Sequence, residues 1–252
     1  PSPTTAGLVY AGTNAGFFRS TNSGTSWMEV DPGGGKAADL IAIPRVGGGA
    51  GDTVFLYMQT GGVFRSDDSG QTFISITPSQ AISADSVGTK RGVLGVTQNG
   101  AHLYMAVEGV TGQGSLASFW YSTNQGTSWT RTHGPLSIGD NVQSWYNLCL
   151  AIDPVTPTRV WVGTTRISLT NDSGVNFSSP YAYNFGPNYS TVPHPDVHTI
   201  VFDKDYNGTT NQRLYLATDG GMYRSSNAAA GTPTFASINN RLGITQFYFG
   251  AV

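Results

Sequence analysis

Short segments in which apolar and polar residues alternate recur along the whole chain, and turns rich in Gly, Asn, Asp and Ser separate them. Alternation with a period of two over a few residues is typical of a half-buried β-strand. Clear examples are residues 8–13 (LVYAGT), 54–57 (VFLY), 103–106 (LYMA), 160–163 (VWVG) and 214–217 (LYLA). The pattern therefore predicts an all-β fold.

These segments belong to a unit that occurs five times. In each unit a second strand leads into the turn [Ser/Thr]-x-[Asp/Asn]-x-Gly-x-x-[Trp/Phe], whose four regular copies are residues 20–27, 66–73, 122–129 and 170–177. The fifth copy reaches its aromatic residue only at Phe235, three residues later than the others. A further apolar strand precedes four of the units, at residues 39–43, 92–96, 145–152 and 198–202.

The spacing of the units indicates their architecture. The closing aromatic residues are 46, 56, 48 and 58 positions apart. Units of this length with several short strands are typical of β-propeller blades. We therefore expect a β-propeller of four-stranded antiparallel blades, with blade repeats at about 1–31, 38–77, 91–133, 145–180 and 197–239.

The turn has a physical explanation in its residue types. The short polar side chains accept hydrogen bonds from the turn backbone, the glycine supplies a positive φ, and the aromatic ring fills the space between sheets. The motif resembles the Asp-box (BNR) repeat of the sialidase, sortilin and xyloglucan-hydrolase superfamily of propellers. Two copies depart from that family pattern because Asn22 and Asn124 replace the aspartate. The motif is expected to be structural.

The two ends of the chain suggest two alternatives. Residues 1–12 match the later part of a unit without its first strand, whereas residues 245–252 look like a first strand without its unit. Residues 245–252 would then complete the first blade of a closed five-bladed ring. Alternatively, the chain is a segment of a larger propeller, which the resemblance of residues 194–252 to family members with further blades favours.

Composition excludes several classes of protein. Charged residues make up 11% of the chain, and 13 Lys and Arg balance 15 Asp and Glu to a net charge of −2. Without a Lys/Arg cluster the chain lacks the charge pattern of a nucleic-acid binder. No apolar run is long enough to span a membrane. One cysteine, Cys149, excludes a disulfide scaffold.

One histidine-rich segment is a candidate site. Pro195 favours an extended conformation at His194, and in an extended chain His194, Asp196 and His198 project to one side. Two imidazoles and a carboxylate would hold a divalent metal such as zinc, contact a ligand, or act in acid–base chemistry. The alternative is a structural polar cluster. Asp219, in a Thr-Asp-Gly-Gly turn, is expected on the same face.

Long loops provide a second candidate surface. One face of the ring is expected to carry the long loops, at residues 77–90, 108–116, 133–144 and 178–197. The resemblance implies that this face binds ligands, as it does in related propellers. Tyr181, Tyr183 and Tyr189 lie there among Asn, Ser and Pro. Exposed tyrosine next to amides is the chemistry of carbohydrate recognition. The alternative is that these rings pack the loop against the fold.

The resemblance also implies which residues an enzyme of this superfamily would require. A sialidase needs three arginines and a Tyr–Glu pair. The suitably placed arginines are Arg91, Arg166 and Arg241, and the only suitably placed glutamate is Glu108. The Phe/Tyr-Arg-Ile-Pro signature is absent. A xyloglucanase-like hydrolase needs two aspartates across a cleft, and spacing selects no pair among Asp39, Asp85, Asp140, Asp196 and Asp219.

The sequence therefore favours a non-catalytic recognition or structural module, secreted or at the cell surface, whose long-loop face binds a glycan or an extracellular protein. Glu108 and Arg166 are included among its expected ligand contacts. One alternative is a glycoside hydrolase or a fragment of one. Another is a subunit of a surface assembly whose terminal strands pair between neighbours, because open strand edges invite pairing.

Overall fold

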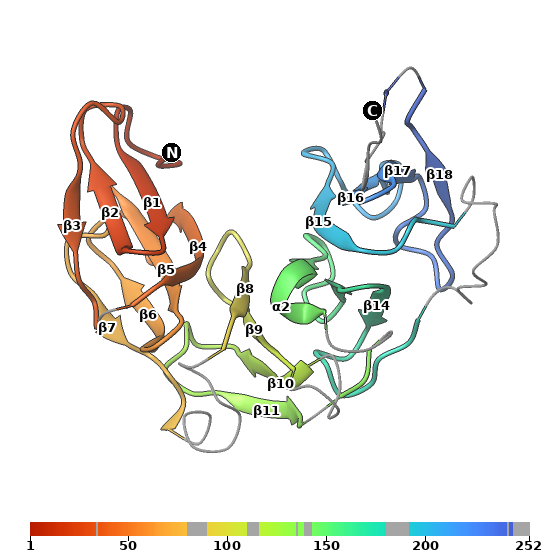
Figure 1. Cartoon of the computed structure of the whole chain (residues 1–252), viewed down its shortest axis with the longest axis horizontal. Coiled ribbons are helices and arrows are strands. Elements are labelled where there is room, and N and C mark those ends of the chain that lie inside the picture. Colours follow the sequence, from red (N-terminus) through yellow and green to blue (C-terminus); the bar gives the residue numbers. More distant parts are fainter. Residues whose placement is uncertain are drawn as a thin grey trace, which may run out of the picture.

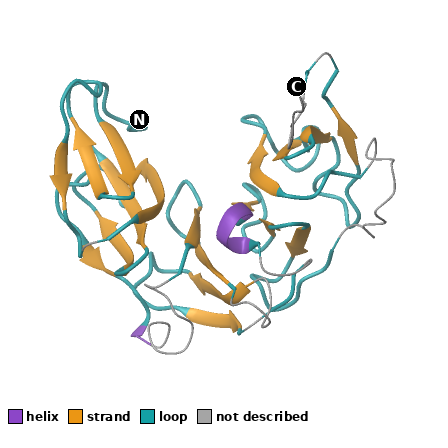
Figure 2. Ribbon diagram, in the orientation of Figure 1, coloured by secondary structure: helices purple, strands orange, loops and turns teal. Residues whose placement is uncertain are grey.

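The computed structural model describes residues 1–33, 35–79, 90–109, 116–134, 136–138, 143–179, 192–240 and 242–243. Their strands form five antiparallel sheets that follow one another along an open arc (Figure 1). Strands dominate the regular structure, and the short helix α2 (Ser144–Asn147) lies on the inner side of the arc (Figure 2). The predicted all-β fold is confirmed.

Within each sheet the strands hydrogen-bond in chain order. The first sheet contains β1 (Val9–Thr13), β2 (Gly16–Ser20) and β3 (Met28–Val30). The second contains β4 (Ala37–Pro44), β5 (Asp52–Met58), β6 (Gly62–Ser66) and β7 (Ile74–Ser75). The third contains β8 (Gly92–Val96), β9 (Leu103–Glu108), β10 (Leu116–Ser122) and β11 (Thr130–His133).

The fourth sheet contains β12 (Cys149–Ile152), β13 (Val160–Gly163) and β14 (Ile167–Thr170), and an isolated bridge from Leu169 to Ser178 stands in place of a fourth strand. The fifth contains β15 (Val197–Phe202), β16 (Leu214–Thr218), β17 (Gly221–Ser225) and β18 (Phe235–Ser237). The successive first strands β4, β8, β12 and β15 contact one another on the inner side of the arc. Residues 245–252 lie outside the described residues, so their pairing stays a prediction.

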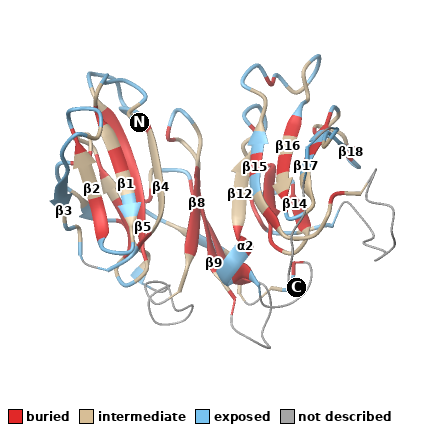
Figure 3. Ribbon diagram, turned by 45° about the horizontal axis from the view of Figure 1, so that its top comes forward, coloured by how far each residue is buried: buried red, intermediate tan, exposed pale blue. Residues whose placement is uncertain are grey.

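The core is divided among the junctions between sheets. Four apolar clusters of described residues each join two neighbouring sheets. For example, Phe55 and Tyr57 of β5 pack with Leu94 and Met105 of the third sheet. Buried residues therefore concentrate along the strands that face neighbouring sheets, while Trp145 and Tyr146 of α2 are exposed (Figure 3). The arc is stabilised by repeated sheet-on-sheet burial of apolar side chains.

The repeated turn has the same hydrogen bonds in its regular copies. In the second sheet the Ser66 hydroxyl donates to Oδ1 of Asp68 (2.7 Å) and accepts from the Gly70 N–H (2.8 Å). Oδ1 of Asp68 also accepts from the Thr72 N–H (2.9 Å). In the longer fifth turn, Oδ1 of Asn227 accepts instead from the Thr234 N–H (2.8 Å), which confirms the insertion.

Positive φ angles occur at two successive positions of the turn. The expected one is the glycine, with φ of 87° at Gly24 and 93° at Gly174. The residue before it is also left-handed, with φ of 61° at both Ser69 and Ser173. A non-glycine residue in this region is strained, and the hydrogen bonds of the turn offset that cost.

Candidate ligand-binding surface

The candidate site lies where three parts of the fifth sheet meet. Val197 pairs with Thr218, and Thr218 pairs with Gly221, so the start of β15, the end of β16 and the start of β17 share one end of the sheet. The Asp219 N–H donates to the Asp196 carbonyl (3.2 Å). The Asp196 N–H in turn donates to the Thr165 carbonyl of the fourth sheet (3.0 Å), so backbone bonds fix the segment before β15.

A histidine–carboxylate pair is exposed at this end. Nε2 of His198 and Oδ1 of Asp219 are 2.6 Å apart, and their side chains are 33% and 31% exposed. The Tyr146 ring stands at 88° to the His198 ring, with centroids 5.0 Å apart. The pair therefore keeps polar atoms accessible next to an aromatic ring.

The aromatic residues come from α2, a helical turn that the sequence pattern did not predict. Trp145 and Tyr146 are 62% and 50% exposed. We expected residues 145–152 to form one strand, but the strand β12 begins only at Cys149. Arg91 holds the helical turn because its guanidinium donates to the carbonyls of Ser144 (3.3 Å) and Leu148 (2.9 Å).

Asp196 links α2 to the fifth sheet. Nδ2 of Asn147 donates to its Oδ1 at 2.7 Å. Partial burial raises the pKa of the Asp196 carboxyl above its usual value, and the negative charge of Asp219 raises it further. The Asn147 bond and the nearby histidines lower the pKa by less. We call Trp145, Tyr146, Asn147, Asp196, His198 and Asp219 the aromatic–carboxylate surface.

The metal interpretation of this segment rested on an extended chain. Asp196 has a φ of 63°, which interrupts the extended conformation between His194 and His198. Nδ1 of His194 lies 2.9 Å from the Pro195 carbonyl, and its ring lies so close to Gly220 that a Cβ there would be 2.4 Å from it. In the described part of the chain, no group of three His, Cys, Asp or Glu side chains is placed to hold a metal ion. The described geometry therefore does not gather His194, Asp196 and His198 around one metal position.

The remaining predicted residues have separate surroundings. Oε2 of Glu108 accepts from the Arg91 N–H (2.9 Å), and Lys90 Nζ lies 3.8 Å from its Oε1. Arg166 follows Thr165 in the turn between β13 and β14, and its carbonyl accepts from the Thr164 N–H (2.8 Å). Tyr181, Tyr183 and Tyr189 lie outside the described residues, as do Asp85, Asp140 and Arg241.

Asp39, another aspartate of the hydrolase hypothesis, has a structural role on the inner wall. Its Oδ2 accepts from the Leu94 N–H at 2.7 Å and its Oδ1 from the Leu40 N–H at 2.8 Å. Burial raises the pKa of Asp39, although these hydrogen bonds and the charge of Arg91 oppose it. The carboxyl therefore joins two inner strands.

A cavity of about 630 Å³ with a mixed lining lies on the inner wall of the arc, where apolar residues such as Leu94 and Phe202 stand beside polar ones such as Asn99 and Asp203. Phe202 is the last residue of β15 and His198 is near its start. Four residues of strand separate them by about 13 Å. The cavity and the aromatic–carboxylate surface are therefore distinct regions of the inner strands.

Neither a family model nor a curated protein matches the chain. Solved structures do match it. The GH74 enzyme of Niastella koreensis has a TM-score of 0.63 at 17% identity over 93% of this chain and 36% of that chain. The GH74 xyloglucanase of Xanthomonas campestris has a TM-score of 0.59 at 17% identity over 92% of this chain and 37% of that one.

A third solved structure with this architecture is PorZ, a surface component of the type-IX secretion system of Porphyromonas gingivalis. Its TM-score is 0.55 at 17% identity over 92% of this chain and 33% of that chain. The chain has a β-propeller fold. It spans about a third of the length of these structures. No helix among the described residues is long and apolar enough to cross a membrane.

Proposed function

We propose that this propeller module recognises a glycan outside the cell or at the cell surface, through the aromatic–carboxylate surface. The observation that carries the proposal is the exposure of Trp145 and Tyr146 next to the His198–Asp219 pair. Aromatic faces stack on the C–H surfaces of sugars, and carboxylate and imidazole groups bond their hydroxyls.

Several features support a glycan as the ligand. Hydrogen bonds hold the surface together, because Arg91 donates to the Leu148 carbonyl and Asn147 donates to Asp196. Its carboxylates, Asp196 and Asp219, would repel an anionic sugar, so we expect a neutral glycan. One structural neighbour is a xyloglucanase and another is a bacterial surface component, which agrees with an extracellular carbohydrate ligand.

Calorimetric titration with soluble xyloglucan oligosaccharides and with a sialylated oligosaccharide tests this proposal. Trp145→Ala should weaken binding of the neutral oligosaccharide at least tenfold, a loss of about 1.4 kcal/mol. Trp27→Ala is the matched control, because Trp27 is an exposed tryptophan (44%) on the first sheet. The proposal fails if neither sugar binds, or if both variants bind as the unchanged protein does.

A second candidate function is glycoside hydrolysis at the same surface. It is favoured by the raised pKa of Asp196 beside the Asp219 carboxylate, since hydrolases use a protonated and an ionised carboxyl together. Reducing ends released during the same incubations check it. Asp219→Asn should abolish their release, and absence of release from the unchanged protein would leave recognition alone.

A further inference from the structure

The cavity on the inner wall of the arc has no part in the function proposed above. Its volume of about 630 Å³ lies within the range of pockets that hold one small molecule. The first strands of the second to fifth sheets form its floor, with apolar side chains such as Ile41, Leu150 and Phe202. We call it the inner-wall cavity.

Three successive connections form the mouth of the inner-wall cavity. They join β8 to β9 (residues 97–102), β12 to β13 (153–159) and β15 to β16 (203–213), and the structure describes each of them throughout. All exposed residues of the lining belong to these connections, namely Gln98, Asn99, Pro154 and Lys204. The cavity therefore has an apolar floor and a more polar mouth.

Hydrogen bonds between neighbouring sheets hold these walls in place. The Tyr206 hydroxyl of the third connection donates to Oδ2 of Asp153 in the second connection (2.7 Å). The Tyr104 hydroxyl of β9 donates to the Pro157 carbonyl (2.9 Å), which ties the second connection to the third sheet. Because the walls are held by bonds within the protein, binding requires little reordering.

The floor depends on a glycine. A Cβ at Gly95 of β8 would lie 2.2 Å from Cδ1 of Leu150. Since residue 95 has no side chain, Leu150 of β12 packs directly against β8. Leu150 and Ile152 are only partly buried by the apolar cluster that they join, so both keep apolar surface toward the cavity.

The charged residues of the lining are each paired with an opposite charge. Oδ2 of Asp203 lies 3.8 Å from Nη1 of Arg213, and Nζ of Lys204 lies 2.5 Å from Oδ2 of Asp205. An ionic ligand on the apolar floor would lose its hydration without gaining a free counter-charge. The exposed amide of Gln98 makes no hydrogen bond to another residue that the structure describes, so it is available to a polar group of an uncharged ligand.

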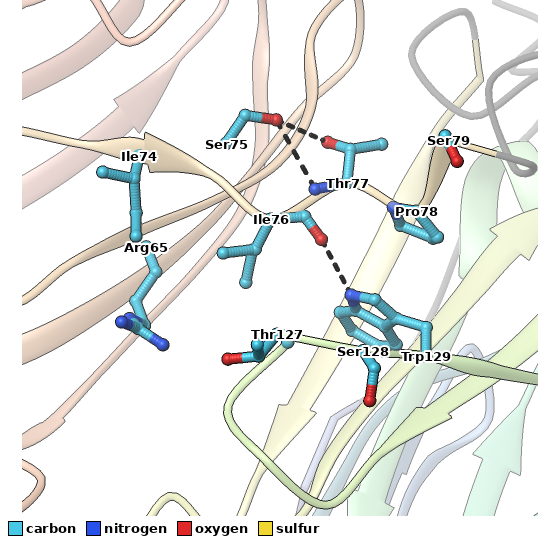
Figure 4. Close-up of a pocket in the computed structure, with 11 residues that line it drawn as sticks. Arg65, Ile74, Ser75, Ile76, Thr77, Pro78, Ser79, Thr127, Ser128 and Trp129 are labelled. Carbon is cyan, nitrogen blue, oxygen red and sulfur yellow. Dashed lines mark hydrogen bonds between the residues drawn. The ribbon is translucent and has the colours of Figure 1, made fainter.

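A pocket on the outer rim provides a contrast. It has a volume of about 540 Å³ and lies between β7 and the third repeated turn (Figure 4). Its polar groups bond one another: Nε1 of Trp129 donates to the Ile76 carbonyl (2.7 Å), and the Ser75 hydroxyl donates to Oγ1 of Thr77 (3.3 Å). These bonds join two sheets, and the rim pocket serves as a control below.

We propose that the inner-wall cavity binds one small, uncharged molecule that has an apolar body and a hydrogen-bonding group at one end. The apolar body would lie on the floor against Leu150 and Phe202, where its burial is favourable. The polar end would lie at the mouth and bond to the amide of Gln98. This site is separate from the aromatic–carboxylate surface, so the proposal does not depend on sugar binding.

Fluorescence titration of the unchanged chain with phenylnaphthylamine, an uncharged apolar probe with one N–H donor, tests the proposal. Its fluorescence should rise to saturation at one probe per chain. Anilinonaphthalenesulfonate has the same ring systems with an added sulfonate. It should bind roughly tenfold more weakly, because the lining offers no free cation. This comparison requires no variant.

Variants of the lining locate the probe. Val96→Glu places a carboxylate at the edge of the floor, and Phe202→Ala removes an aromatic wall; each should weaken binding of the uncharged probe by roughly tenfold. Gln98→Ala should weaken it by about threefold through loss of one hydrogen bond. Ile74→Glu is the matched control, because it places the same carboxylate in the rim pocket, where Ile74 is 55% exposed. It should leave probe binding unchanged.

Circular dichroism checks that each variant is folded, and Gln98→Ala, at an exposed position, provides a test even if the two floor variants unfold. Trp145→Ala should bind the probe as the unchanged chain does, which separates this site from the proposed sugar site. The proposal is overturned if the unchanged chain shows no saturable site for the uncharged probe, or if the sulfonated probe binds as tightly. It is also overturned if the folded lining variants all bind like the unchanged chain, or if Ile74→Glu weakens binding as much as they do.

Discussion

The repeated turns and the aromatic–carboxylate surface lie at opposite ends of the same sheets, and they shift the pKa values of their carboxyl groups in opposite directions. In the turns, partial burial acts to raise the pKa of Asp68, but hydrogen bonds from Thr72, Ser66 and Gln71 outweigh it and lower that pKa. At the surface, burial and the negative charge of Asp219 outweigh the hydrogen bond from Asn147 and the nearby histidines, so the pKa of Asp196 is raised. The turns satisfy their charges and stabilise the fold, whereas the surface leaves polar groups available to a ligand.

The largest effect should come from filling the closest contact of a turn. Gly174 has a φ of 93°, and a Cβ there would lie 2.4 Å from Cδ1 of Phe119. Gly174→Ala should therefore lower the free energy of unfolding by about 2–4 kcal/mol, through backbone strain and overpacking together. Urea denaturation measures it.

Gly231→Ala is the matched control, because a Cβ at Gly231 has no atom within 4 Å. It should change the stability by less than about 0.5 kcal/mol. Equal effects at the two glycines would show that the turn does not depend on close contact with the preceding sheet.

A smaller effect is expected from the turn carboxylate. The pKa of Asp68 is lowered by folding, so its stabilising contribution is present above the unfolded pKa and is lost as pH falls through the folded one. Asp68→Asn should cost about 0.5–1 kcal/mol at neutral pH, since the amide keeps one acceptor oxygen and the site is partly exposed. Below the folded pKa the variant and the unchanged protein should converge.

Denaturation at neutral and acidic pH measures this dependence. Asp205→Asn provides the comparison, because the carboxylate of Asp205 bonds only to the exposed Lys204 among the contacts of the described residues. It should have little effect at either pH. If Asp68→Asn still lowered the free energy of unfolding at acidic pH, the charge of Asp68 would not be the source of its contribution to stability.

The turns could be predicted from the sequence because their chemistry is local. Every partner of Asp68 lies within four residues of it, so one motif specifies the hydrogen bonds. Five copies, 46 to 58 residues apart, then indicate five sheets. The left-handed residue before each glycine escaped prediction, since Ser69 and Gln125 are not residue types that demand a positive φ.

The surface could be predicted only in part. His198 and Asp219 were expected on one face, and the antiparallel register of β15 and β16 explains their proximity. The helix α2 was missed because its support is distant: Arg91 is more than fifty positions away from the carbonyls that it binds. Local periodicity contains no signal for such a contact. The pair of adjacent aromatic residues, 145 and 146, at the head of an unusually long apolar run was the available sign.

The smallest effect, and the sharpest test of the contrast, is expected at Asp196. Folding raises the pKa of this carboxyl, so the folded state binds its proton more tightly than the unfolded state does. Stability therefore falls as pH rises from the unfolded pKa through the folded one, opposite to Asp68.

Asp196→Asn removes this penalty while an amide oxygen still accepts from Asn147. At neutral pH the free energy of unfolding should stay constant or rise by up to about 0.5 kcal/mol, because water screens the partly exposed site. A loss as large as that from Asp68→Asn would place Asp196 with the structural carboxylates and remove the distinction between the two ends of the sheets.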